Sequence, residues 1–525
     1  MRRMSDTHMR SSVTRRSFLV TSAAAAGVLL GRAPALAFRD VTGPNPFTLG
    51  VASGDPAVDG VVLWTRLATD PLVENGLGGM PSRGVEVRWE LAEDERFSRG
   101  LRRGRLEARP DSAHAVHVEV SGLRPGRPYW YRFTAMGHRS LTGTTRTAPA
   151  ADALASARLG VVSCSRYEDG YFTAYRHLAD EHPDLVLHLG DYLYEAGVRP
   201  DRPRQVVGPE ITTLADYRRR HALYKTDPDL QQLHARAPFA VVWDDHEVDN
   251  NWAGLVPEDG QTPEQFRARR AAAFQAYHEM MPLRRAARPD RDGMRLYRTL
   301  QWGRLATLYM LDTRQYRDDQ PCGDGARVGC QERLDPSRTM LGGVQEQWLR
   351  AQAAASSARW DVLGQQVFFS ELVYPRPEGL ASPVDSWNGY VAARQRVVEM
   401  FSGRPRNLVV LTGDVHNSYA ANLPHTPDPE SRPAGVEFVT TSVTSGGDGQ
   451  PTTPFYDELL RRNPNVVFSN NQRGYLLCEA TADTWQTHYR VVPYVTREGA
   501  PVETRRSFVV EAGRPRLEAL TSAAL

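Results

Sequence analysis

The sequence predicts an α/β layered domain that follows an all-β domain, and three observations predict this arrangement. Short runs of β-branched and aromatic residues, punctuated by Gly and Pro, fill residues 40–147. From residue 158 onward, apolar strand-like runs alternate with amphipathic helical segments. Four of those runs stop abruptly in polar side chains, as strands do when they deliver ligands to the carboxyl edge of a sheet.

Length and composition agree with a two-domain globular protein. The chain has 525 residues, which is more than one hydrophobic core usually fills. Apolar residues make up 41% and charged residues 24% of the chain, values that are ordinary for a globular protein. Lys225 is the only lysine, so nearly all positive charge is arginine, and this bias indicates no particular function.

Residues 1–37 carry the pattern of a twin-arginine export signal. The arginine pair in Thr14–Val20 leads into a short alanine-rich apolar segment, Phe18–Gly31, and residues 35–37 fit the small-x-small cleavage rule. An uncleaved membrane anchor is the alternative, but the apolar segment is short for a span of ~20 residues. We therefore expect export by the twin-arginine machinery, and a secreted or cell-envelope protein that begins at Phe38.

Charge and hydropathy exclude two classes of partner for the mature chain. Loss of the signal would remove six arginines and one aspartate, which changes the formal net charge from +2 to −3. No basic surplus then remains to favour a nucleic-acid-binding surface. No later segment is long and apolar enough for a transmembrane helix.

The four cysteines have three different expected roles. Cys322 and Cys330 lie in one Gly- and Asp-rich loop, so in an exported protein a disulfide between them is expected. Cys478 lies in an apolar run and is expected to be a buried strand thiol. Cys164 ends a predicted strand and belongs to the site considered below.

Residues 40–147 are expected to form a β-sandwich domain. Its clearest predicted strands are Val61–Thr65, Val85–Leu91, Ala115–Val120 and Tyr129–Phe133. The segment Leu123–Tyr131 resembles the corner of a fibronectin type III-like sandwich, where a tight turn leads into an aromatic strand. Residues 148–157 are small and flexible enough to be the linker to a second domain, residues 158–525.

The second domain is predicted to alternate strands and helices. The predicted strands are Arg158–Cys164, Leu185–Leu189, Phe239–Trp243, Leu305–Leu311, Val362–Phe368, Leu408–Thr412 and Val436–Ser442, with final strands near Tyr475–Glu479 and Trp485–Val492. The predicted helices are Tyr175–Asp180, Pro263–His278, Val344–Ala354 and Val391–Phe401. The tail segment Arg514–Ala523 is expected to be a helix, and whether it covers a site stays open.

Four strand ends carry candidate ligands. The segments are Val161–Arg166, Leu187–Glu195, Val241–Trp252 and Leu408–His416. The third places seven polar residues within eight positions directly after an apolar run. Because each apolar strand turns into polar residues, we expect one shared site at the carboxyl ends of these strands.

The four motifs together resemble the PhoD-type alkaline phosphatases of the calcineurin-like metallophosphoesterase superfamily. The chain contains Ser-Cys-Ser, Gly-Asp-x-x-Tyr, Asp-Asp-His-Glu and Gly-Asp-x-His in that order. The resemblance also takes in the export signal and the β domain, so it covers nearly the whole chain. It implies a metallophosphoesterase domain in which β-sheets are sandwiched by helices.

The resemblance implies a first metal site that holds one Fe³⁺. Asp191 would bridge two cations, Tyr194 would bind as a phenolate, Cys164 as a thiolate, and His416 would complete the protein ligands. Such a donor set suits a trivalent iron, which strongly lowers the pKa of its ligands. Each residue also has a structural alternative, such as a buried thiol, a core tyrosine, a turn cap or a supporting histidine.

The second metal site would hold one or two Ca²⁺. By the resemblance, its ligands would be Asp191, Asp245, Asn250 and Asp414. Carboxylate and amide oxygens suit calcium, which tolerates irregular coordination. The sequence alone does not choose between Asn250 and Asn251, and the family pattern favours Asn250.

Substrate would be bound by fewer residues. His246 takes the place of the family histidine that contacts phosphate and protonates the leaving group. Arg166 would steady a phosphate oxygen, with a surface salt bridge as the alternative. Trp387 would lie near the site, with core packing as the alternative. Asp244 and Glu247 are expected to contact the metal ligands or the surrounding structure rather than a cation.

The resemblance thus implies an exported metal-dependent alkaline phosphatase and phosphodiesterase. A hydroxide or oxide between the cations would attack phosphorus in line, and no Gly-x-Ser-x-Gly elbow supplies a serine nucleophile. One alternative is a phospholipase D-like phosphodiesterase that acts on lipid head groups. A non-catalytic phosphate-binding protein would be expected to lack His246 or Asp191, but both residues are present.

Overall fold

The computed structural model describes residues 43–258, 260–291, 293–402, 407–426 and 431–520. The predicted export signal, its cleavage point and the end of the tail lie outside the described residues. Among the described residues, no helix combines the length and apolar character that a membrane crossing requires.

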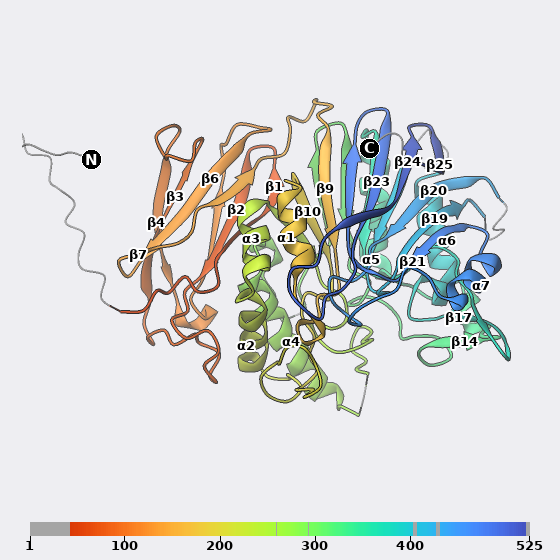
Figure 1. Ribbon diagram of the computed structural model, residues 1–525, viewed down its shortest axis with the longest axis horizontal. Helices are drawn as coiled ribbons and strands as arrows, with labels where there is room; N and C mark the ends of the chain where they lie inside the picture. The colour runs from red at the N-terminus through yellow and green to blue at the C-terminus, as the bar shows by residue number, and fades with distance from the viewer. Residues whose placement is uncertain (1–42, 259, 292, 403–406, 427–430, 521–525) are drawn as a thin grey trace, which may run out of the picture. The chain divides into compact units, whose positions relative to one another are not determined.

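Two large sheets organise the chain (Figure 1). The ten-stranded sheet has the order β25 (Arg514–Ala519), β24 (Glu503–Glu511), β23 (Thr484–Val492), β22 (Arg473–Ala480), β9 (Ala157–Val162), β10 (Leu185–Leu189), β11 (Phe239–Val242), β1 (Val51–Ala57), β2 (Gly60–Arg66), β5 (Ala115–Val120). The seven-stranded sheet has the order β12 (Arg298–Trp302), β13 (Ala306–Met310), β15 (Trp360–Gln365), β18 (Leu408–Thr412), β20 (Pro433–Val439), β19 (Ser418–Pro424), β21 (Val466–Asn470).

Two smaller sheets complete the β-structure. The first contains β4 (Arg102–Ala108), β3 (Val85–Ala92), β6 (Pro128–Ala135) and β7 (His138–Arg139), with β8 (Gly143–Arg146) paired to β6. The second contains β14 (Ala326–Val328), β17 (Gly379–Pro383) and β16 (Tyr374–Arg376).

Seven α-helices are described. They are α1 (Thr173–Asp180), α2 (Leu214–Lys225), α3 (Pro228–Arg236), α4 (Pro263–Met280), α5 (Gly342–Ala355), α6 (Val391–Met400) and α7 (Pro454–Arg462). Local sequence sets two of their starts. Thr213 and Asp216 form a capping box that begins α2, and Thr262 and Gln265 form another that begins α4.

Apolar side chains between the layers hold the two large sheets together. One cluster contains side chains of β9, β10 and β11 together with side chains of β13, β15, β18 and β20, and it extends to α1–α4. A second cluster joins the other face of the seven-stranded sheet to α5 and α6. Helices therefore flank paired sheets, which agrees with the α/β layered class that the sequence predicts.

Parallel pairing places the ends of the central strands at common edges. In the ten-stranded sheet, β10 pairs in parallel with both β9 and β11. In the seven-stranded sheet, β13, β15, β18 and β20 are mutually parallel neighbours. The loops that follow these strands can therefore meet, as the carboxyl-end rule for such sheets requires.

The first hundred described residues form two facing sheets with an apolar core between them. Side chains of β2, β5, β3 and β6 share this core. The strand β1 also pairs in parallel with β11, with Gly54 opposite Phe239, so one of the facing sheets continues into the ten-stranded sheet. Arg124 donates its backbone N–H to the Tyr129 hydroxyl at 2.8 Å where β6 begins. The fibronectin type III-like class stays a prediction.

The helix expected at the C-terminal tail is wrong. Residues Arg514–Ala519 form β25, which pairs antiparallel with β24. Gly513, with a φ of 86°, makes the turn between these strands, and glycine reaches this backbone region without a steric penalty. The tight turn returns the chain to the sheet edge and removes the start of the expected helix.

The structure confirms two expectations for the cysteines. Cys322 and Cys330 form a disulfide, and the Cys478 thiol is fully buried within β22.

Candidate metal centre

Loops from both large sheets bring ligand-type side chains into three overlapping groups. Each group holds three ligand atoms that all lie within 4.8 Å of one another. The groups are Cys164, Asp191 and His416; Asp191, Asp245 and His246; and Asp244, Asp245 and Asp414. Every residue in these groups comes from one of the four strand ends that the sequence singles out.

The first half of the centre consists of Cys164, Asp191, Tyr194 and His416. The Tyr194 hydroxyl donates to Asp191 Oδ2 at 2.6 Å and lies 3.0 Å from His416 Nε2. Cys164 and Tyr194 are at most 1% exposed. A thiol, a carboxylate, a phenol and an imidazole thus converge in one buried place, as the sequence predicts for the iron site.

Four of the candidate ligands have left-handed backbone conformations. The φ angles are 58° for Cys164, 53° for Asp191, 66° for Asp414 and 52° for His416. Non-glycine residues rarely adopt this region, and each instance costs on the order of 1–3 kcal/mol unless the surroundings enforce it. Such strain gathers at functional sites, where it turns a side chain toward a fixed point.

The second half contains Asp244, Asp245 and Asp414, together with a buried arginine that the sequence analysis missed. Arg314 lies in the loop after β13 and is 0% exposed. Its Nε donates to Asp244 Oδ1 at 2.5 Å, and its Nη2 lies 3.6 Å from Asp245 Oδ1 and 3.9 Å from Asp414 Oδ1. This half therefore already contains one fixed positive charge.

Buried oxygens without partners indicate where cations would fit. Asp191 Oδ1, Asp245 Oδ1 and Asp244 Oδ2 are buried and have no hydrogen-bond partner in the described part of the chain. Buried carboxylate oxygens are normally hydrogen-bonded or bound to a cation. Because Asp191 and Asp245 belong to one group within 4.8 Å, a cation between the two would relieve their repulsion.

The donors of the first half are neutral in the absence of a cation. Burial, with Asp191 next in importance, raises the pKa of the Cys164 thiol well above its usual value. Burial likewise raises the pKa of Tyr194, with Asp191 and Cys164 adding to the effect. Burial lowers the pKa of His416 to about 3, so its imidazole is neutral and free to bind a metal.

Fixed charges determine protonation in the second half. Burial opposes the charge on Asp245, but Arg314 and His246 outweigh burial and lower its pKa below the usual value. Burial and Asp244 instead raise the pKa of Asp414 well above its usual value. When no cation is bound, Asp245 therefore ionises more readily than Asp414.

His246 has a buried carboxylate partner. Its Nδ1 lies 2.7 Å from Glu195 Oε2, and its ring lies 4.1 Å from the Tyr194 ring between centroids. Burial lowers the pKa of His246, but Glu195, Asp245 and Asp191 outweigh burial and raise it well above 6.5. A charged imidazole oriented by a carboxylate is suited to proton donation.

Glu247 supports two of the ligand-bearing loops. Its carboxylate accepts the backbone N–H groups of Asp191 at 3.1 Å, Tyr192 at 2.5 Å and Asp244 at 2.8 Å. The side chain is 1% exposed. This placement agrees with the supporting role that the sequence predicts for Glu247.

Three predicted residues lie at the margin of the groups. Arg166 places its guanidinium 4.3 Å from the Tyr194 ring centroid and its Nε 3.4 Å from Glu168 Oε1. Asn250 directs its amide nitrogen to Glu258. Trp387 is fully buried, so core packing, the alternative interpretation, describes its environment.

The indole of Trp387 donates to Gln365 Oε1 at 2.9 Å and packs on Phe369. A side chain with no exposed surface cannot touch a substrate in this conformation. The aromatic segment around Trp387 therefore contributes to the core between the seven-stranded sheet and α6.

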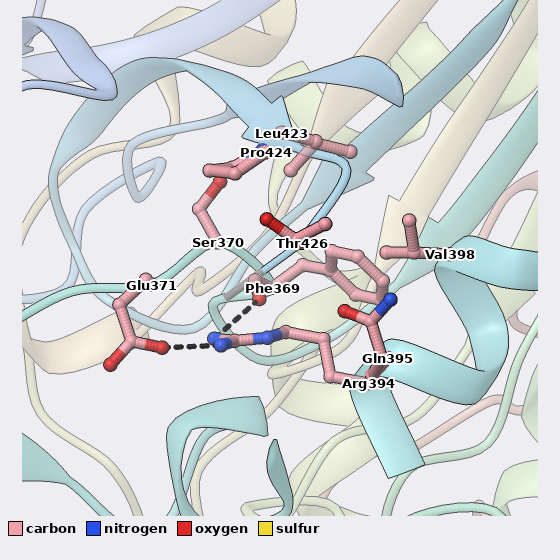
Figure 2. Close-up of a pocket in the computed structure, with 9 residues that line it drawn as sticks. All are labelled: Phe369, Ser370, Glu371, Arg394, Gln395, Val398, Leu423, Pro424 and Thr426. Carbon is pink, nitrogen blue, oxygen red and sulfur yellow. Dashed lines mark hydrogen bonds and ion pairs between the residues drawn. The ribbon is translucent and has the colours of Figure 1, made fainter. Parts of the chain in front are cut away.

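The structure contains two hollows of very different size, one beside Glu195 and one beside Arg394. A cleft of about 810 Å³ is lined by Glu195, Glu210 and Asp249 and by α4 residues such as Arg269. Figure 2 shows the other, a cavity of about 20 Å³ beside the ion pair of Arg394 with Glu371. The small cavity has room for about one water molecule, whereas the cleft is large enough for an organic group.

The sequence motifs did not predict the roles of Glu195 and Arg314. Glu195 lies within a stretch that was already singled out, but the spacing gave no reason to pair it with His246. Arg314 follows the predicted strand Leu305–Leu311, so inspection of every predicted strand end for polar residues would have found it.

Comparisons with known proteins support one family. The chain matches the family described as PhoD-like phosphatase over residues 159–489, and that described as PhoD-like phosphatase, N-terminal domain, over residues 32–149. Alkaline phosphatase D of Bacillus subtilis is 46% identical over 533 residues, which cover 98% of this chain and 91% of that protein.

Solved structures agree with the sequence matches. A structure described as PhoD is 47% identical, covers 92% of this chain and 93% of its own, and has a TM-score of 0.88. The purple acid phosphatase PPD1 of yellow lupin is 12% identical, covers 88% of this chain and 73% of its own, and has a TM-score of 0.52, which shows a shared fold alone. With more than half its length matched by the family and nearly all of it by one relative, this chain belongs to the PhoD-like phosphatases.

Proposed function

We propose that this protein is a phosphoric ester hydrolase, an alkaline phosphatase and phosphodiesterase that uses two kinds of cation. The observation that carries the proposal is the convergence of three buried ligand groups, in which one carboxylate oxygen each of Asp191, Asp244 and Asp245 has no hydrogen-bond partner among the described residues. Membership of the PhoD-like phosphatases and the 46% identity to alkaline phosphatase D support the same reaction class.

The first half would hold one Fe³⁺ through Cys164, Asp191, Tyr194 and His416. The donors suit a strongly polarising cation, because the thiol and the phenol must both lose their protons to bind. Tyr194 and Cys164 would then give the protein a visible colour, since phenolate and thiolate ligands of ferric iron absorb visible light.

The second half would hold Ca²⁺, in one or two ions, through oxygen ligands. Asp191, Asp245 and Asp414 supply carboxylates, and Asn250 would supply an amide oxygen. With His246 assigned to the substrate, the remaining donors are hard oxygens, which favour calcium over zinc. Asp244 is less suited to direct binding, because Arg314 already holds one of its oxygens at 2.5 Å.

When bound, the cations would lower the pKa of a water molecule to supply the nucleophile and would neutralise charge on the phosphoryl oxygens. The protein's own residues would do the rest. His246 would donate a proton to the leaving oxygen. Glu195, whose Oε2 lies 2.7 Å from His246 Nδ1, would keep the imidazole in its charged form. Arg166 would bind a phosphoryl oxygen from its position beside the Tyr194 ring.

The cleft beside Glu195 would accept the organic part of the substrate. Its volume of about 810 Å³ is sufficient for the alcohol of a monoester or for one arm of a diester. Carboxylates contribute much of its polar lining, so the cleft would favour neutral or amine-bearing alcohols over polyanionic ones.

A comparison of substrates tests this function. The full chain, stripped of metal and then supplied with Fe³⁺ and Ca²⁺, is assayed with p-nitrophenyl phosphate, bis(p-nitrophenyl) phosphate and phosphatidylcholine vesicles. Hydrolysis of both chromogenic esters, absent from the stripped chain, is the expected result. Turnover of the lipid alone would favour the phospholipase D-like alternative, and binding of phosphate without turnover would refute the proposal.

We also propose an export route and a division into domains. Residues 1–37 would direct export by the twin-arginine machinery, which carries folded proteins and therefore suits metal loading before export. Residues 40–147 would form the N-terminal domain, 148–157 the linker and 158–525 the catalytic domain. N-terminal sequencing of exported protein tests the first assignment, since the mature chain is expected to begin at Phe38.

A further inference from the structure

The loop after β20 lies directly against the first half of the centre. It comprises residues 440–446 and joins β20 to the region before α7. Val443 donates its backbone N–H to the Ser163 carbonyl at 3.0 Å, and Ser445 donates its own to the Cys164 carbonyl at 3.3 Å. The loop therefore borders the strand end that carries the candidate thiolate.

The Ser445 hydroxyl touches three residues of the centre. Its oxygen lies 2.8 Å from the Cys164 carbonyl oxygen and 2.8 Å from the Tyr194 hydroxyl, and it accepts the backbone N–H of Arg166 at 3.1 Å. The side chain is 0% exposed. One buried hydroxyl thus connects the backbones of Cys164 and Arg166 to the phenol of Tyr194.

Arg473 joins this loop to His416. From the start of β22, its Nη1 donates to the carbonyl oxygens of Ser445 at 2.6 Å and His416 at 3.0 Å, and to Ser442 Oγ at 2.6 Å. The residue is 2% exposed, and its Nη2 also donates to the Asn471 carbonyl, so its hydrogen-bond partners in the described part of the chain are carbonyl and hydroxyl oxygens. Burial of a charge is costly, so its retention here calls for a role that hydrophobic packing would not fill.

The two side chains act on residues whose backbones are strained. Cys164 and His416 have φ angles of 58° and 52°, in the left-handed region. Such conformations persist only where surrounding contacts over-determine them. Ser445 fixes the carbonyl of Cys164, and Arg473 fixes the carbonyl of His416, so each strained residue is held through its own backbone.

We propose that Ser445 and Arg473 are positioning residues that hold Cys164, Tyr194 and His416 in the metal-binding arrangement before any metal is bound. The inference rests on the proposed function, because it assumes that these three side chains bind the first cation. It adds two residues from outside the four motifs, one in the loop after β20 and one at the start of β22.

The test uses the full chain with matched substitutions. Ser445→Ala removes the hydroxyl, and Arg473→Met removes the four described side-chain hydrogen bonds while keeping an apolar stem. Thr441→Val is the control, because Thr441 lies in the same loop, is 1% exposed and has a hydroxyl without a hydrogen-bond partner among the described residues. Arg473→Lys is the conservative variant, since lysine keeps the charge but not the planar fork.

Two measurements are made on each variant: Fe³⁺ affinity by competition with a chelator, and the visible absorption band. Loss of groups that support metal ligands typically costs 10–100-fold in metal affinity, and we expect about that loss for Arg473→Met, with partial recovery in Arg473→Lys. Ser445→Ala should shift the absorption band, because the Tyr194 oxygen loses a hydrogen-bonding neighbour. Thr441→Val should match the wild type in both measurements.

Unfolding of the variants is measured separately, so that a general loss of stability is recognised. If Arg473→Met does not fold, the decision rests on Ser445→Ala and Arg473→Lys. Wild-type iron affinity and an unshifted band in Ser445→Ala, with iron affinity of Arg473→Lys also unchanged, would overturn the inference. A wild-type chain that binds no iron would instead overturn the proposed function.

Discussion

The two halves of the centre differ in how their ligands are prepared for a cation. The first half contains neutral donors, because burial raises the pKa of Cys164 and Tyr194 and lowers that of His416. Hydrogen bonds to the backbone carbonyls of Cys164 and His416 hold the arrangement of these donors. The second half contains several carboxylates, and its arrangement is held by the guanidinium of Arg314, which lies 3.6 Å from Asp245.

The difference shows that geometry and charge can be supplied by different means within one site. In the first half a cation must displace protons, so binding there favours a cation that strongly lowers ligand pKa values. In the second half a fixed positive charge already offsets part of the carboxylate charge. The second half should therefore release and rebind its cation more easily than the first.

The largest expected effect comes from Asp191, which belongs to two of the three ligand groups and is the proposed shared ligand of both halves. Asp191→Asn should lower turnover of p-nitrophenyl phosphate on the order of 10⁴-fold and should reduce the content of both cations. Asp245→Asn should also lower turnover but should leave iron content unchanged, because Asp245 lies outside the group that is proposed to hold iron. Loss of iron in both variants would show that the halves are not separable.

Arg314 should matter for stability more than any residue of the first half. Arg314→Met leaves Asp244 without its buried partner, whereas Asp385 keeps the ion pair with Arg317 at 2.6 Å. Breaking a buried ion pair costs about 3–5 kcal/mol. We expect the metal-free variant to lose unfolding free energy of this size in denaturant titrations at neutral pH. Ca²⁺ should restore part of the loss, since it supplies positive charge to the same carboxylates.

The control for this prediction is Arg66→Met. Arg66 is also 0% exposed, but its guanidinium binds the carbonyls of Ala113 and Gly76 in the N-terminal region. Its loss should destabilise the chain without any recovery in Ca²⁺. Equal recovery in both variants would contradict the assignment of Arg314 to the cation site.

Glu195 should affect the rate through His246 without altering either metal. Glu195→Gln weakens the hydrogen bond at His246 Nδ1 and removes the charge that keeps the imidazole protonated. We expect kcat to fall about 10–100-fold, toward the lower end of what acid catalysis contributes, with KM and metal content unchanged. Glu210→Gln is the matched control, because Glu210 lines the same cleft but pairs with Arg269.

The last expected effect concerns the pH dependence of stability, through a buried cation outside both halves. Burial lowers the pKa of Lys225 to about 7, from an unfolded value near ~10.4. Between these values the unfolded chain binds more protons, so the unfolding free energy should rise with pH, by up to ~1.4 kcal/mol per unit from this residue. Lys225→Met removes the buried charge, so at pH 7 the variant should have the larger unfolding free energy. This difference from the wild type should shrink as the pH rises to ~10.4, because Lys225 then becomes neutral in both the folded and the unfolded chain.

This slope is obtained from denaturant titrations of both chains at several pH values with the metals held constant. Lys225 lies 3.0 Å from the Tyr192 hydroxyl and 4.5 Å from the Trp64 ring centroid, so the replacement leaves the ligand atoms untouched. A pH-independent difference between the two chains would mean that Lys225 keeps its charge state throughout this range.

The sequence predicted the strands better than the contacts between their ends. The strands Leu185–Leu189 and Leu408–Thr412 have the predicted bounds, because a short apolar run between turn residues marks a buried strand clearly. The helix α2 was missed, since eight of its twelve residues are buried and several of these are charged or aromatic, which hides the usual periodicity.

The site was predictable where one motif carried both the strand and its ligand. Arg314, Ser445 and Arg473 lie outside the four motifs. Their places beside strands can be read from the sequence, but their roles depend on contacts between loops that are far apart in the chain. Ser445 is 281 positions from Cys164, and Arg314 is 70 positions from Asp244. Only the fold brings such residues together, and their types alone suit many other roles.

The central claim is that two chemically different halves hold two different cations. Anomalous diffraction from crystals of the holoprotein, recorded on either side of the iron absorption edge, tests it most directly. The account predicts an iron peak among Cys164, Tyr194, His416 and Asp191, and no iron peak between Asp245 and Asp414. An iron peak between Asp245 and Asp414, or no iron peak in either half of an active crystal, would contradict the account.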